Sequence, residues 1–151
     1  MTVDRLLKWI VMTLSEAGWA PFLILLLHAF AVVAVDAYRR FASLDVLMHF
    51  AGGVAIAWFL HRASINASRC RVIGPFHPVT HGVLVGSLVC VAALVWEFAE
   101  FFLDQSLGTH YQPGLDDTMT DLLVGIAGGS FLLAGVGFLG HIRRAANERS
   151  E

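Results

Sequence analysis

The stretch GVLVGSLVCVAALVWEFAEFFLD, residues 82–104, decides the fold of this chain. Its first fifteen residues carry no charge, and three acidic residues, Glu97, Glu100 and Asp104, then follow at helical spacing. About 20 predominantly apolar residues are enough to cross the hydrocarbon core of a bilayer as a helix. We therefore predict a membrane span over about residues 82–103, with its carboxylates gathered at one end.

Three other segments have the same character, over about residues 19–37, 44–60 and 118–140. Apolar residues make up 57% of the 151-residue chain and charged residues 15%, whereas a soluble domain has about 45–50% and about 25%. Residues 3–16 have an apolar stripe and Trp9 as an interfacial anchor, which is typical of a short helix lying at the membrane surface. The sequence thus predicts an all-α, polytopic membrane protein. It forms a single membrane domain over residues 1–151, a four-transmembrane-helix bundle with a short N-terminal interfacial helix.

The basic residues predict the orientation of this bundle. With four spans, both termini share a side, and eight of the ten Lys and Arg residues fall on that side; only Arg39 and Arg40 fall on the other. The positive-inside rule then puts both termini in the cytoplasm. The loop over residues 64–81 is expected to be cytoplasmic, and the loop over residues 105–116 periplasmic.

Acidic residues on three of the predicted spans lie toward the periplasmic side. They recur at intervals of three or four, which puts them on one face of each helix. Glycines continue two of these faces, and small residues let membrane helices approach closely, so we expect the faces to point into the bundle. The candidate metal ligands are Asp45, His49, Glu97, Glu100, Asp104, Asp117 and Asp121.

Ionisable residues inside a membrane are expensive and usually functional. Six carboxylates with almost no basic residue nearby need water, protonation or a bound cation to compensate them. Carboxylates with imidazole suit Fe, Mn, Zn or Mg, and the charge is enough for two ions. The alternative is a solvated polar vestibule without a ligand. Glu97 is the residue that this alternative explains least well, because apolar residues surround it in the sequence.

Other signals in the sequence are weaker. Cys70 and Cys90 are expected on different sides of the bilayer centre, so no disulfide is predicted. Cys70, His77 and His81 resemble zinc-ligand spacing, but no second cysteine pair accompanies them.

Three further polar residues have an ordinary structural explanation or a functional one. His28 lies within the first predicted span, where it either reaches the acidic site or bonds a backbone carbonyl. Asp36 is expected to pair with Arg39 or Arg40, and His110 lies in a loop that could cap the site.

The strings DVLMHFAGG (residues 45–53), WEFAE (residues 96–100) and DDTMTD (residues 116–121) resemble a known family. They are similar to the uncharacterised bacterial inner-membrane family of YjdF-type proteins, over about residues 44–129. The resemblance implies that His49, Glu97, Glu100, Asp117 and Asp121 form one group. It implies no activity.

The leading functional hypothesis is a metal-binding protein of the inner membrane, whose carboxylate and histidine site opens to the periplasmic face. It is either a small membrane metalloenzyme or a metal-handling protein, and catalytic residues stay unassigned. The alternatives are an accessory subunit of a larger membrane complex and an ion or proton translocation component. The expected partners are the lipid bilayer and either further copies of the chain or a larger complex. No nucleic-acid-binding pattern is present.

Overall fold

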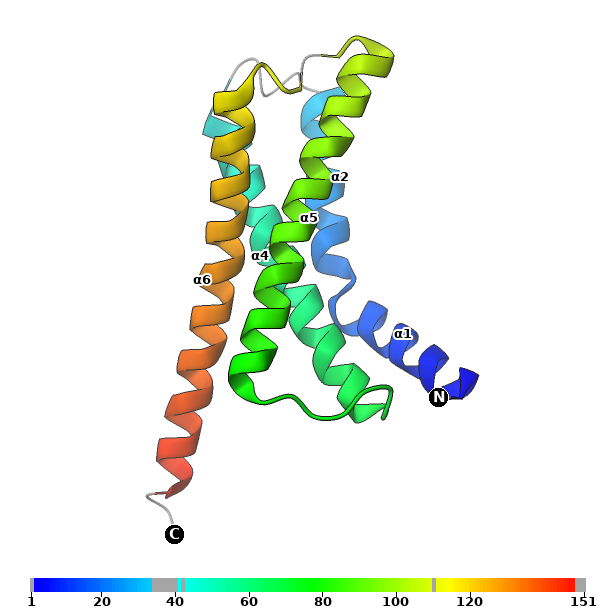
Figure 1. Ribbon diagram of the computed structural model, residues 1–151, viewed down its shortest axis with the longest axis vertical. Coiled ribbons are helices and arrows are strands. Elements are labelled where there is room, and N and C mark those ends of the chain that lie inside the picture. Colours follow the sequence, from blue (N-terminus) through cyan, green and yellow to red (C-terminus); the bar gives the residue numbers. More distant parts are fainter. Residues whose placement is uncertain (1, 34–40, 42, 110, 149–151) are drawn as a thin grey trace.

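The fold is a bundle of helices, seen in a computed structural model that describes residues 2–33, 41, 43–109 and 111–148 (Figure 1). All secondary structure in these residues is helical. The helices are α1 (Val3–Ala17), α2 (Trp19–Val33), α4 (Ser43–Arg69), α5 (Pro78–Leu107) and α6 (Leu115–Glu148). This confirms the predicted all-α fold class, with a short helix at the N-terminus.

Three of these helices are long and apolar enough to cross a membrane: α4, α5 and α6 over Leu115–His141. A fourth crossing is present if α1 and α2, which pass the same test together, form one span bent by 55°. The predicted first span, residues 19–37, coincides with α2 as far as Val33, and residues 34–37 lie outside the described part of the chain. The predicted surface helix at residues 3–16 coincides with α1.

The bend between α1 and α2 occurs at Gly18. A Cβ at this position would lie 2.7 Å from the backbone oxygen of Leu14, closer than ordinary packing permits. The side chain of Trp9 anchors α1 to α4, because its Nε1 donates a hydrogen bond of 2.8 Å to the backbone oxygen of Ala63. The bend therefore lets α1 leave the line of α2 and lie against the far half of α4, as Figure 1 shows.

A second polar contact holds α1 and α4 together. The Arg62 guanidinium donates to Oε2 of Glu16 through Nε, at 3.1 Å, and through Nη2. Nδ2 of Asn66, a fully buried residue, donates to the same oxygen at 3.0 Å. Glu16 thus accepts hydrogen bonds from two residues of α4, and the short N-terminal helix is fixed to the bundle.

The predicted cytoplasmic loop at residues 64–81 is wrong in extent, because α4 continues to Arg69 and α5 begins at Pro78. The drop in hydropathy after Leu60 marks a change of surroundings rather than the end of the helix. The connection is therefore residues 70–77, and His77 ends it by accepting a hydrogen bond of 3.3 Å from the backbone N–H of Val79.

The closest packing in the bundle is between α4 and α6, and glycines make it. A Cβ on Gly53 would overlap the backbone oxygen of Gly125, and one on Gly128 would overlap that of Phe50. Small residues in membrane helices permit this backbone approach. Further along the bundle, Ala57, Val85 and Val89 form an apolar core between α4 and α5.

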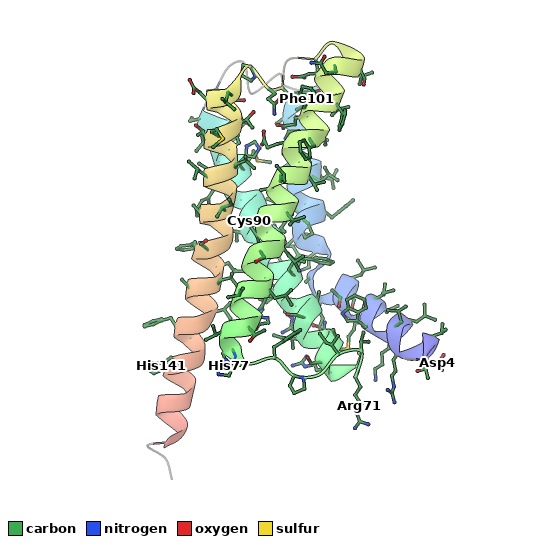
Figure 2. The ribbon with its side chains drawn as sticks, in the orientation of Figure 1. Asp4, Arg71, His77, Cys90, Phe101 and His141 are labelled. Carbon is green, nitrogen blue, oxygen red and sulfur yellow. The ribbon has the colours of Figure 1, made fainter. Side chains whose placement is uncertain are left out.

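The helix ends sort into two groups (Figures 1 and 2). The start of α1, the end of α6 and the connection over residues 70–77 lie at one end of the bundle, where Figure 2 labels Asp4, Arg71, His77 and His141. The starts of α4 and α6 and the end of α5 lie at the other end, near Phe101. Both cysteines are free, as predicted, with Cys70 in the connection and Cys90 halfway along α5.

Candidate metal centre

The site is built where α4 and α6 begin and α5 ends. Asp45 and His49 come from the first two turns of α4, and Asp121 from the second turn of α6. Glu97 and Glu100 come from the last third of α5, which runs in the opposite direction. These five predicted ligands therefore lie together, although 76 residues separate the first from the last (45 to 121).

His49 is the centre of this group. Its Nδ1 lies 3.2 Å from Oδ1 of Asp121, 3.2 Å from the backbone oxygen of Asp45 and 3.5 Å from Oδ1 of the same residue. Its Nε2 points to the other side, 3.6 Å from Oε1 of Glu97. One imidazole thus faces carboxylates from all three helices.

The five residues form two overlapping sets that could each hold a metal ion. Asp45, His49 and Asp121 make one set, and His49, Glu97 and Glu100 make the other. Within each set the ligand atoms lie within 4.8 Å of one another. Ligands 2.0–2.2 Å from a common metal are about 3–4 Å apart, so each set needs only a small contraction to enclose an ion.

Three of the four carboxylates are deeply buried, and Asp45 is partly exposed. Only 4% of Glu97, 6% of Glu100 and 3% of Asp121 is exposed. Among the described residues, no Lys or Arg forms an ion pair with any of them. The Nε2 of His49 is also buried, and it has no hydrogen-bond partner in the described part of the chain. The site therefore offers several oxygen and nitrogen atoms that can bind a cation, and one of them, Nε2 of His49, makes no hydrogen bond in the described residues.

Two residues that the sequence analysis did not select support the carboxylates. Nε1 of Trp96 donates a hydrogen bond of 2.8 Å to Oε1 of Glu100, one turn further along α5. Nε2 of Gln112, in the connection between α5 and α6, donates to Oε2 of Glu97 at 3.1 Å. The spacing of Trp96 and Glu100 could have indicated the first contact. No local pattern indicated the second.

Asp104 and Asp117, the other two predicted ligands, belong to neither set. The carboxylate of Asp104 organises the connection after α5: it accepts hydrogen bonds of 2.9 Å from the backbone N–H groups of Tyr111 and Gln112 and one of 2.5 Å from Oγ1 of Thr109. Asp117 lies half-buried in the first turn of α6. The structure thus concentrates the predicted site on five of its seven members.

The sequence matches the family described as "Predicted membrane protein (DUF2238)" over residues 8–142. This chain belongs to that family. Membership confirms the resemblance to YjdF-type proteins that the sequence indicated. The chain is also similar to an uncharacterized protein of Thermotoga maritima, with 32% identity over 104 residues. These residues cover 68% of this chain and 52% of the relative, so the chain spans about half the length of the curated relative it matches. No solved structure matches.

The histidines that gave weaker signals in the sequence of this DUF2238 chain have structural contacts of their own. The ring of His28 packs edge-on against Trp96, with centroids 5.0 Å apart. His81 lies 2.7 Å from Oγ of Ser64 through its Nε2, and His77 caps α5, so neither is gathered around Cys70 in a metal-binding set. The predicted partners of Asp36 and the predicted role of His110 lie outside the described residues.

Proposed function

We propose that this protein binds a divalent metal ion within the membrane, through Nε2 of His49 and the carboxylates of Glu97 and Glu100. The observation that carries the proposal is the buried, unpartnered Nε2 of His49 lying 3.6 Å from Oε1 of Glu97. A histidine that binds a metal usually donates its other ring N–H to a carboxylate or a backbone carbonyl. Nδ1 of His49 has both kinds of acceptor nearby, in Asp121 and Asp45.

The charge of the site supports the same proposal. An ionised carboxylate costs about 2.5–3.5 kcal/mol at the centre of a bilayer and less toward its surface. Four carboxylates lie around His49, and three of them are buried. A protonated His49 is the competing explanation, because it forms ion pairs with Asp45, Asp121 and Glu97 without a metal. It supplies one positive charge at most, whereas a divalent ion supplies two and also binds Glu100, which forms no ion pair with His49 in the described residues. A second ion between Asp45, His49 and Asp121 would bind Nδ1 of His49, and the imidazole would then bridge two ions in place of donating that hydrogen bond.

We propose Fe, Mn, Zn or Mg as the metal, because one imidazole with oxygen ligands suits each of them. The proposed location is a bacterial inner membrane with both termini in the cytoplasm, supported by the eight-to-two distribution of Lys and Arg. In this orientation the site opens to the periplasmic face. A reporter fused after Glu151 is expected to be active only as a cytoplasmic fusion, and a periplasmic signal would move the site to the cytoplasmic face.

Translocation of ions or protons has less support. Polar side chains such as His61 and His81 lie near the opposite end of the bundle, with ring centroids 5.0 Å apart. The apolar cluster of Ala57, Val85 and Val89 separates them from the metal centre. A relay would need a continuous chain of polar groups, and this core interrupts it in the described residues.

Metal content measured on the purified protein in mild detergent tests the proposal. We expect close to one Mn, Fe or Zn per chain after incubation with each metal and removal of the excess. Glu97→Gln and Glu100→Gln are each expected to lower this content at least tenfold. Asp116→Asn is the matched control, because it removes the same charge from an exposed position at the same end of the bundle.

Wild-type protein with less than about 0.2 metal per chain after this incubation would overturn the proposal. An equal loss of metal in Asp116→Asn would also contradict it, since general acidity rather than the buried set would then retain the ions.

A further inference from the structure

A cavity of about 160 Å³ adjoins the metal centre on the side of α2. Its walls are mostly apolar and come from α2, α4, α5 and α6; among them are Ile24, Leu25, Met48, Ile56, Ala93 and Trp96. His49, Glu97 and Asp121 line it as well. The cavity therefore joins an apolar space to the proposed metal ligands.

The size of the cavity limits what enters it. An apolar cavity of about 150 Å³ in another protein accommodates benzene, so this one has room for a chain of about six carbon atoms. Such a space is far too small for a whole phospholipid. It fits the first part of one hydrocarbon chain, the part next to the head group.

The α2 side of the cavity is the side that we expect to face the surrounding lipid. Leu25 lines it and is 51% exposed on the outside of the bundle. In the described residues, α2 packs against α1 and α4 but makes no close backbone approach to α5. His28 of α2 and Trp96 of α5 bridge this seam with their rings. The remainder of a long chain can leave the bundle through the seam.

We propose that the ligand of the metal centre is a single-chain amphiphile with an oxyanion head group, either a carboxylate or a phosphate. Its head would coordinate the metal beside His49, its first carbons would lie in the cavity, and its tail would pass between α2 and α5 into the bilayer. The inference rests on the proposed metal site, because carboxylates without a metal repel an anion. A divalent ion neutralises its two carboxylate ligands, Glu97 and Glu100, and an oxygen anion can then be an additional ligand of the ion.

Gly52 provides a way to close the cavity without disturbing the metal. It lines the cavity, and a Cβ on it would meet only Cγ2 of Ile24, at 3.9 Å. In Gly52→Leu the new side chain occupies the space intended for the ligand chain. Gly135→Leu is the matched control, because it adds the same side chain on α6 where nothing lies within 4 Å.

The experiment uses the protein in nanodiscs of phosphatidylcholine, loaded with Zn²⁺. Zinc stands high in the order of affinities for nitrogen and oxygen ligands and does not quench fluorescence. The ligands are dodecanoate and dodecyl phosphate brominated near the head group, and bromododecanol is the neutral comparison. Bromine quenches the fluorescence of a nearby tryptophan, so Trp96 reports occupation of the cavity, and Trp96→Phe identifies its part of the signal.

We expect saturable quenching by at least one of the two anions, at least tenfold weaker binding in Gly52→Leu, and unchanged binding in Gly135→Leu. The anion that binds more tightly identifies the head group. Zinc content, measured on the same samples, should be equal in the wild type, Gly52→Leu and Gly135→Leu; Trp96→Phe removes a hydrogen bond to Glu100 and serves only to assign the fluorescence. Equal binding of dodecanol, or full quenching in Gly52→Leu, with zinc present, would overturn this inference and leave the metal site standing. Absence of zinc from the wild type would overturn the metal site, and this inference with it.

Discussion

Two adjacent glycines of α4 are expected to respond in opposite ways to the same substitution. In Gly53→Ala the added Cβ would lie 2.8 Å from the carbonyl carbon of Gly125 and 3.1 Å from the backbone nitrogen of Gly129, where ordinary contacts begin at 3.4 Å. Both neighbours are backbone atoms, so no side-chain rotation relieves the overlap and α4 must move away from α6. In Gly52→Ala the Cβ meets only Ile24, at 3.9 Å.

The magnitude follows from these contacts. Overpacking costs about 1–3 kcal/mol in a core, and the rigid neighbours place Gly53→Ala at the upper end. A protein of this size loses about 2–4 °C of Tm per kcal/mol, which gives a loss of about 6–12 °C. Gly52→Ala removes a helix-interior glycine without a clash and should stabilise the protein by about 0.5–1 kcal/mol.

The assay is thermal unfolding of both variants in the same detergent, with metal content measured in parallel. Gly53 lies one turn beyond His49, and Gly125 lies one turn beyond Asp121, so separation of the two helices should also lower metal binding in Gly53→Ala. Equal Tm values for the two variants, or a more stable Gly53→Ala, would refute the glycine-mediated contact between α4 and α6.

Three further substitutions test the supporting contacts. Gln112→Ala removes the donor to Glu97 and should weaken metal binding about 10–100-fold, measured by competition with a chelator; unchanged affinity would exclude a supporting role. Asp104→Asn should retain the metal and lose hydrogen-exchange protection in the connection after α5, because its carboxylate accepts backbone N–H groups there; loss of metal would restore it as a ligand. Arg62→Met breaks the ion pair with Glu16 and should destabilise the protein, seen in denaturant unfolding; protease resistance of α1 equal to that of the wild type would show that the pair does not anchor this helix.

Much of the fold could be predicted because the bilayer imposes length and composition on each helix. The runs around residues 44–60, 82–103 and 118–140 all lie within observed helices. The ends of the helices could not be predicted in this way, since hydropathy reports where a chain leaves lipid and not where it stops being helical. α4 continues past Leu60 to Arg69 for this reason, and its polar residues find partners such as Glu16.

The candidate site could be predicted in part from helical spacing. Spacing puts Glu97 and Glu100 on one face, and the opposite directions of α5 and α6 bring that face to Asp121. Spacing gives no information about a connection between helices, so the role of Gln112 was not predicted. Spacing also puts Asp104 on the same helix face as Glu97 and Glu100, although its carboxylate accepts hydrogen bonds from the backbone N–H groups of the following connection.

The coordination of a bound metal tests the central claim most directly. Zinc-edge X-ray absorption of the zinc-loaded protein should show a first shell of oxygen and nitrogen at about 2.0–2.2 Å, with outer-shell scattering from one imidazole that disappears in His49→Gln. Sulfur in the first shell, or scattering from two or more imidazoles, would contradict the account, because the metal would then lie with Cys70 and the histidines near the other end of the bundle.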